Sequence, residues 1–214
     1  MDDKGRSFRG TAVLVGVLFL TSTATFAAGS SLVASYFSGD SLEISTLLAG
    51  VLLEVYTGLA VAGIGLAMLP LLRRHHAQLA AAYLALRALE CLAIVGVGGY
   101  MLARHQELQR YDLLIYSFTA VGGIVFSYLL LVSGLVSRLL SMLGLLGYAL
   151  LLLGLPVALA GLAELDAGGG MMFLVPGGLF ELLLPLLLLV KGFSTQAPQP
   201  AWVPPTRSAT IRSS

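Results

Sequence analysis

Four ionisable side chains interrupt long apolar stretches of this 214-residue chain, and they are the residues best suited to chemistry: Glu54, Arg87, Glu90 and Glu181. A carboxyl group that has left water can donate, accept or release a proton, or bind a ligand that carries polar groups. One arginine cannot neutralise three acids, so at least one carboxyl group is expected to hold a proton at neutral pH. The sequence therefore predicts a site that binds or translocates a small polar ligand or protons.

The spacing of these residues indicates how they meet. Tyr83, Arg87 and Glu90 follow one another at i, i+4 and i+7, which places them on one face of a helix. Arg87 can then bridge Glu90 on its own helix and either Glu54 or Glu181 across a helix interface. Counting about 1.5 Å per residue puts Arg87 roughly 15 Å from the terminal side of its helix, with Glu90 about one turn further in. Glu54 and Glu181 lie roughly 13–15 Å from the opposite ends of their helices, and we interpret these positions as one common depth.

Three hydroxyl groups are expected to extend this polar site. Thr57 follows Glu54 by one helical turn, and Tyr128 and Tyr148 fall near the middle of their own apolar stretches. Each tyrosine is also compatible with a core position at which the hydroxyl group has found one partner.

The elements that must hold these residues are transmembrane helices. The chain has 57% hydrophobic and 11% charged residues and a mean hydropathy of +0.92, whereas soluble domains have about 25% charged residues. Spanning a bilayer takes roughly 20 apolar residues. The stretches that qualify are 11–37, 46–72, 77–103, 113–136, 139–163 and 171–191.

We therefore predict an all-α polytopic membrane protein, a bundle of six transmembrane helices. Its parts are a basic N-terminus at 1–10, the transmembrane domain at 11–193, and a disordered tail rich in Pro and Ser at 194–214. A stretch of basic and apolar residues at the start resembles a secretory signal, but the apolar character continues to Phe37, so we expect the first helix to be retained.

Six crossings put both termini on one side of the membrane, and the basic residues near the helix ends predict which side this is. On the terminal side lie Lys4, Arg6, Arg9, Arg73, Arg74, Arg138, Lys191, Arg207 and Arg212, against Arg104 and Arg110 on the other. Both termini are therefore expected to be cytoplasmic. The net charge of +1 gives no indication of a nucleic-acid partner.

Several other chemistries have little support. His75 and His76 are adjacent and His105 lies on the opposite side, so their spacing does not suit a metal site, and no cofactor is expected. Cys91 is the only cysteine, which excludes an intrachain disulfide. The predicted helices contain serines but no histidine, so an intramembrane enzyme would lack the usual pair of nucleophile and base.

Two main readings of the charged residues stay open beside this third, enzymatic one. In the first, the charges form a site that binds or translocates a small polar ligand or protons. In the second, they lock helices together in an accessory or scaffold subunit that packs against another membrane protein. The lipid bilayer is the expected environment in both readings, and a membrane-protein partner or a second copy of the chain is left open.

Several segments resemble one family of bacterial membrane proteins, grouped as domain of unknown function 4386. These segments are "VGVLFLTSTATF", "LLEVYTGLAVAGIGLAMLPLLRRHH", "AYLALRALECL", "SRLLSMLGLLG" and "LFELLLPLLLLVKGF". The resemblance covers about residues 8 to 193, and its polar positions are Glu54, Arg87, Glu90, Glu181 and Lys191. It implies a single membrane domain with an uncleaved first helix, in the inner (plasma) membrane of a bacterium. It brings no activity, cofactor or catalytic residue with it.

Overall fold

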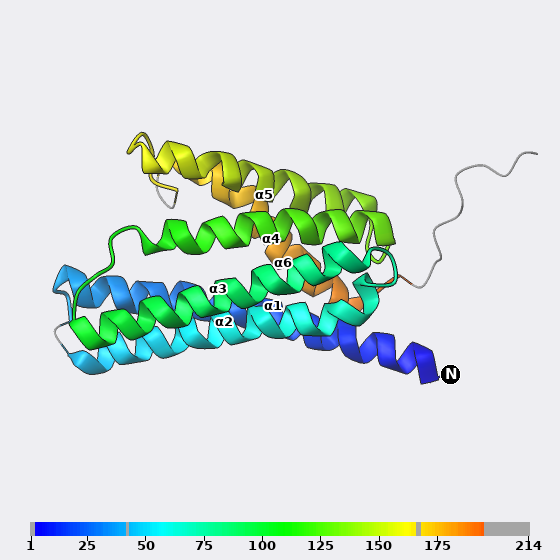
Figure 1. Cartoon of the computed structure of the whole chain (residues 1–214), viewed down its shortest axis with the longest axis horizontal. Coiled ribbons are helices and arrows are strands. Elements are labelled where there is room, and N and C mark those ends of the chain that lie inside the picture. The colour runs from blue at the N-terminus through cyan, green and yellow to red at the C-terminus, as the bar shows by residue number, and fades with distance from the viewer. Residues whose placement is uncertain (1–2, 42, 166–167, 195–214) are drawn as a thin grey trace, which may run out of the picture.

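A computed structural model describes residues 3–41, 43–165 and 168–194, and the residues described are almost entirely helical. The predicted tail at 194–214 lies outside them, except for Ser194. The helices are α1 (Asp3–Ser38), α2 (Ile44–Leu72), α3 (Ala77–Arg104), α4 (Tyr111–Ser133), α5 (Arg138–Leu159), the short 3₁₀ helix η1 (Gly168–Gly170) and α6 (Met171–Val190). Short connections join them into one antiparallel bundle (Figure 1).

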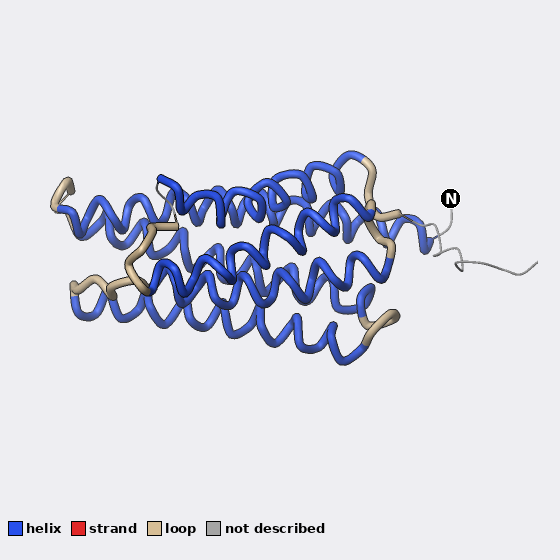
Figure 2. The backbone as a smooth tube through the Cα atoms, turned by 90° about the horizontal axis from the view of Figure 1, so that it is seen from above, coloured by secondary structure: helices blue, strands red, loops and turns tan. Residues whose placement is uncertain are grey.

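The bundle closes on itself. Each long helix packs on its neighbours along the chain, and α6 packs back on α1. All of the long helices follow the long axis of the molecule in both views (Figures 1 and 2), and the start of α1 lies at the same end as the end of α6. We refer to this end as the terminal end.

Within the described residues, six helices are long and apolar enough to cross a membrane. Their outward faces carry bulky apolar side chains, among them Leu59, Leu92, Leu153 and Val190, each at least 60% exposed. A soluble protein rarely leaves such extended apolar surface in contact with water. The predicted six-helix bundle is confirmed, and it is compatible with a multi-pass membrane protein.

Glycines set the closest approaches between neighbouring helices. A Cβ atom added to Gly147 of α5 would lie 2.7 Å from the Cα of Gly177 in α6, so the two backbones touch at this point. Small residues allow this kind of contact between transmembrane helices. Glu181 follows Gly177 by one turn of α6 and Tyr148 follows Gly147 on α5, so the contact brings this acid and this tyrosine together.

Candidate functional site

A cavity of about 430 Å³ lies inside the bundle, and we refer to it as the inner cavity. All six long helices contribute to its wall. The residues with polar side chains in this wall are Ser22, Thr23, Ser30, Thr57, Tyr83, Arg87, Glu90, Tyr116, Thr119, Tyr148 and Glu181. Six of the residues selected from the sequence are among them, namely Thr57, Tyr83, Arg87, Glu90, Tyr148 and Glu181.

Arg87 and Glu90 form a closed ion pair on one side of the inner cavity. Arg87 Nη1 lies 2.8 Å from Glu90 Oε2, and the two side chains are only 9% and 4% exposed. The hydroxyl group of Thr119 in α4 donates to Glu90 Oε1 at 2.6 Å. The predicted pairing within α3 is therefore confirmed, and Thr119 ties this pair to α4.

Arg87 itself also reaches across to α4. Its Nη2 donates to the backbone carbonyl groups of Phe118 and Thr119, at 3.4 and 3.2 Å. Its Nε is buried and has no hydrogen-bond partner among the described residues. The guanidinium carbon lies 5.4 Å from the centre of the Tyr83 ring, within the range of a cation–π interaction.

Two glycines make room for the arginine side chain. A Cβ atom on Gly65 of α2 would lie 3.2 Å from Arg87 Cβ, and one on Gly122 of α4 would collide with the guanidinium group. The side chain of Arg87 therefore passes between α2 and α4 through space that only glycine leaves open. Its position is fixed by packing as well as by hydrogen bonds.

Glu181 occupies a different part of the same wall. Its Oε1 accepts a hydrogen bond from the hydroxyl group of Tyr148 at 2.8 Å. The described residues provide no ion pair for it, although the positive charge of Arg87 is near enough to attract it. Unlike Glu90, Glu181 is only half-buried, and it lines the inner cavity.

The predicted bridge from Arg87 to Glu54 is wrong. Glu54 is 1% exposed and does not line the inner cavity; its Oε1 accepts a hydrogen bond from Tyr111 of α4 at 2.9 Å. Gly65 lies beside Arg87, and it follows Glu54 by eleven positions, or about 16 Å along α2. Helices α2 and α3 have 29 and 28 residues, so equal distances counted from opposite ends do not give the same depth.

The predicted hydroxyl groups divide in the same way. Tyr128 is 44% exposed and does not line the inner cavity, so its expected place in the site is wrong. Thr57 does line it, where its Oγ1 lies 2.8 Å from Thr25 Oγ1 and donates to the carbonyl group of Ser22 at 3.2 Å. Thr57 therefore belongs to the interface between α1 and α2 as well as to the cavity wall.

Sequence reasoning missed the contribution of α1 to the site, and on α4 it selected Tyr128 in place of Thr119. Ser22, Thr23 and Phe26 of α1 line the inner cavity, and Thr119 of α4 holds Glu90. The run "TSTAT" at 21–25 was a signal, since consecutive hydroxyl groups are unusual in a lipid-facing helix. Such a run is compatible with a helix that lines a polar cavity as well as with one that packs closely against another helix.

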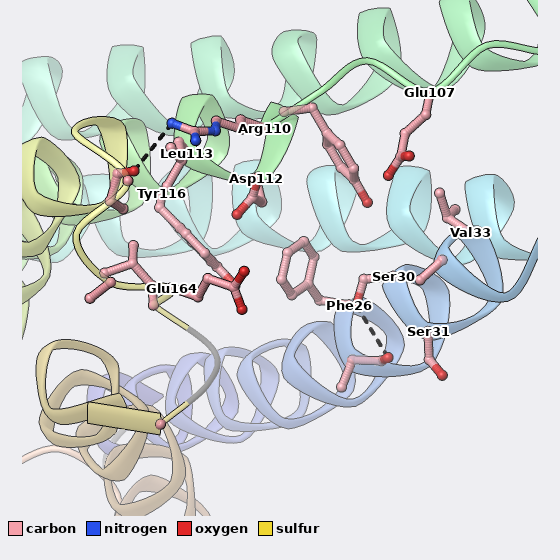
Figure 3. Close-up of a pocket in the computed structure, with 18 of the residues that line it drawn as sticks. Phe26, Ser30, Ser31, Val33, Glu107, Arg110, Asp112, Leu113, Tyr116 and Glu164 are labelled. Carbon is pink, nitrogen blue, oxygen red and sulfur yellow. Dashed lines mark hydrogen bonds between the residues drawn. The ribbon is translucent and has the colours of Figure 1, made fainter. Parts of the chain in front are cut away.

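A larger cavity of about 980 Å³ opens at the end of the bundle opposite the terminal end, and we refer to it as the vestibule. Figure 3 shows Glu107, Asp112 and Glu164 around it, together with Arg110. Arg110 Nη1 donates to the carbonyl groups of Ala158 and Leu159, at 3.2 and 3.0 Å. Arg110 therefore stabilises the end of α5, where backbone carbonyl groups lack helical partners.

The vestibule and the inner cavity share part of their walls. Phe26, Ala27, Ser30 and Tyr116 line both of them. The rings of Phe26 and Tyr116 meet edge to face across this boundary, with their centres 6.2 Å apart. An aromatic pair therefore stands between the vestibule and the carboxyl groups further inside.

The arrangement suits binding better than nucleophilic catalysis. Ser127 is buried, and its Oγ has no hydrogen-bond partner among the described residues, but it does not line the inner cavity, and neither do Ser133 and Ser141. Histidine is also absent from the residues that line this cavity. The groups present can bind charge, donate and accept hydrogen bonds, and exchange a proton.

Comparisons with known proteins give no indication of function, so the function is inferred from the geometry of the chain. No family model, no curated protein and no solved structure matches the sequence or the fold.

Proposed function

We propose that this chain is a multi-pass membrane protein that binds a small polar ligand in its inner cavity. The observation that carries the proposal is Glu181, a half-buried acid with no ion pair among the described residues, in the wall of an interior cavity of about 430 Å³. Sites for small molecules usually have volumes of about 300–1,000 Å³ and a mostly apolar wall with a few converging polar groups. The inner cavity has both properties.

The cost of placing charge in a membrane supports a binding role for Glu181. An ionisable side chain at the centre of a transmembrane helix costs roughly 2.5–3.5 kcal/mol on insertion scales. The Arg87 and Glu90 pair offsets its cost through mutual attraction and the hydrogen bond from Thr119. Glu181 has one hydrogen bond and no ion pair among described residues. A ligand or a proton would supply what it lacks.

The proposal includes the membrane in which the protein lies and the side from which the ligand enters. We place the protein in the inner membrane of a bacterium with both termini cytoplasmic, supported by the basic residues Arg73, Arg74 and Arg138 at the terminal end. The vestibule then faces away from the cytoplasm. A ligand would reach the inner cavity from that side, past Phe26 and Tyr116.

A substitution that fills the cavity tests the proposal. Gly178 lines the inner cavity, and a Cβ atom there would meet nothing within 4 Å, so Gly178→Leu should occupy the cavity without a backbone clash. Gly96 on α3 is exposed and equally free of neighbours, so Gly96→Leu is the matched control. Binding of small polar compounds to the full chain in lipid nanodiscs is measured by saturation-transfer NMR.

The proposal expects binding to the native chain and to Gly96→Leu, with at least a tenfold loss in Gly178→Leu. The proposal is contradicted if the small polar compounds bind none of the three proteins, or if they bind all three equally. Thermal unfolding of each variant shows whether Gly178→Leu is still folded.

One observation favours the second candidate function, a structural lock in an accessory subunit. Arg87 and Glu90 of α3 use most of their polar atoms on α4 or on each other. A lock alone predicts that Gly178→Leu stabilises the protein by filling empty space and changes no binding. It also predicts recovery of a stoichiometric membrane-protein partner in mild detergent.

A further inference from the structure

We infer that the ligand of the inner cavity is a small organic cation with an apolar body, and that Glu181 is its counter-charge. This inference rests on the proposed function and adds the chemical class of the ligand. It depends on the charges of the inner cavity, on the aromatic rings in its wall, and on the acidic vestibule through which it opens.

The charges of the inner cavity do not cancel. Among the described residues, its wall has one base, Arg87, and two acids, Glu90 and Glu181. Arg87 is already paired with Glu90 at 2.8 Å, and Thr119 occupies the other oxygen of Glu90 at 2.6 Å. Glu181 is the remaining charge, and an uncompensated carboxylate away from water is costly. A cation is the ligand that removes this cost.

The rest of the wall favours a cation with an apolar body over a metal ion or a strongly hydrated ion. The ring of Tyr83 already has Arg87 and Phe126 as partners. The other aromatic rings in the wall come from three helices, and they are those of Phe19, Phe26, Tyr116 and Tyr148. The faces of such rings attract organic cations. Glu181 lies beside the ring of Tyr148, whose hydroxyl group donates a hydrogen bond to this carboxylate at 2.8 Å. The cationic group and its apolar substituents would therefore both find partners.

The vestibule carries the same sign of charge. Glu107, Asp112 and Glu164 lie around it. Arg110, the one basic residue among the described residues that line it, is bound to carbonyl groups at the end of α5 (Figure 3). A cleft with walls of one charge raises the local concentration of the opposite ion and its rate of association. Cations would collect at the opening and anions would be repelled from it.

A set of compounds with one shape and three charges tests this inference. The probes are 3-phenylpropylammonium, 3-phenylpropanol and 3-phenylpropanoate, measured by saturation-transfer NMR on the full chain in nanodiscs of zwitterionic lipid. Gly178→Leu is the control for compounds that merely dissolve in the bilayer, because their signal persists when the inner cavity is filled. We expect the ammonium compound to bind at least tenfold more tightly than the alcohol, and the carboxylate not to bind.

Two carboxyl variants locate the counter-charge. Glu181→Gln should weaken binding of the ammonium compound at least tenfold and leave binding of the alcohol unchanged, which also shows that this variant is folded. Glu54→Gln is the matched control, because Glu54 is a buried acid with a tyrosine partner that lies outside the cavity wall. It should leave binding of both compounds unchanged.

Failure of this inference is distinguishable from failure of the proposed function. If the alcohol or the carboxylate binds as well as the ammonium compound, and Gly178→Leu abolishes this binding, the inference is overturned and the binding site is retained. Equal loss of cation binding in Glu54→Gln and Glu181→Gln overturns the assignment of Glu181. Binding of none of the three probes, or binding that Gly178→Leu leaves intact, contradicts both proposals.

Discussion

Glu54 and Glu181 are two acids inside the same bundle with the same kind of partner and different surroundings. Each accepts one hydrogen bond from a tyrosine of a neighbouring helix, Tyr111 at 2.9 Å and Tyr148 at 2.8 Å. Glu54 is 1% exposed and lies outside the inner cavity, whereas Glu181 is half-buried and lines it. A tyrosine partner is therefore common to both, whereas their exposure and the open space beside them differ.

This difference separates a structural acid from a binding acid. Both residues are the kind of intramembrane carboxyl group that suggests function by default. Glu54 joins α2 to the start of α4 through Tyr111, and it lines neither the inner cavity nor the vestibule. Glu181 has room next to it for a ligand. Access, rather than depth or charge alone, distinguishes the two.

The largest effect expected in the cavity wall comes from removing the arginine. Arg87→Met leaves Glu90 buried without its counter-charge, which should lower the free energy of unfolding by about 3–5 kcal/mol. The double variant Arg87→Met/Glu90→Met should recover most of this loss, because neither charge is then left alone. Reversible unfolding in mixed lipid–detergent micelles measures both. Equal stability of the single and double variants would contradict the view that Arg87 is needed to neutralise the buried Glu90.

A smaller effect is expected where the backbone makes room for the arginine. Gly122→Ala places a methyl group against the guanidinium group of Arg87, and overpacking of this kind costs typically about 1–3 kcal/mol. Gly96→Ala on the exposed face of α3 meets no neighbour, so it should change stability by about 0.5 kcal/mol or less. The same unfolding experiment compares them, and similar values for the two variants would show that Arg87 can move aside.

The two tyrosines sharpen the comparison of Glu54 with Glu181. Tyr111→Phe leaves a fully buried acceptor unsatisfied, which costs about 1–3 kcal/mol. Tyr148→Phe should cost less, about 0.5–1.5 kcal/mol, since solvent or a ligand in the cavity can replace the lost hydrogen bond. Unfolding of the two variants side by side tests this order. A reversed order would mean that Glu181 is the more enclosed of the two acids.

The smallest effect is expected at the terminal end. Arg9 is exposed and donates to the carbonyl groups of Leu189 and Val190 at 3.1 Å. Arg9→Met should therefore cost about 1 kcal/mol or less, compared with the loss expected for Arg87→Met. A cost at Arg9 equal to that at Arg87 would remove the distinction between surface and interior arginines in this bundle.

The sequence predicted the bundle well because the length and hydropathy of each stretch are local properties. The helix α6 (Met171–Val190) was predicted at 171–191, and α3 (Ala77–Arg104) at 77–103. The pairing of Arg87 with Glu90 was also predictable, since a spacing of three within one helix brings two side chains together whatever surrounds them.

The relative depth of residues on different helices was not predictable in this way. It depends on how neighbouring helices slide past each other, and glycine contacts such as those of Gly58 with Cys91 and Gly65 with Arg87 fix this register. For this reason Glu54 was expected beside Arg87 and lies elsewhere. The role of Thr119 was missed for the same reason, because its partner Glu90 belongs to another helix.

Access of water-soluble reagents to the inner cavity tests the central distinction most directly. Cys91 is the only cysteine, so Cys91→Ala provides a background for Gly178→Cys in the cavity wall and Gly96→Cys on the outer face. A cationic methanethiosulfonate reagent should modify Gly178→Cys in nanodiscs, faster than an anionic reagent of the same size, and leave Gly96→Cys unmodified. Equal protection of both cysteines would show that the inner cavity is closed and would contradict the account.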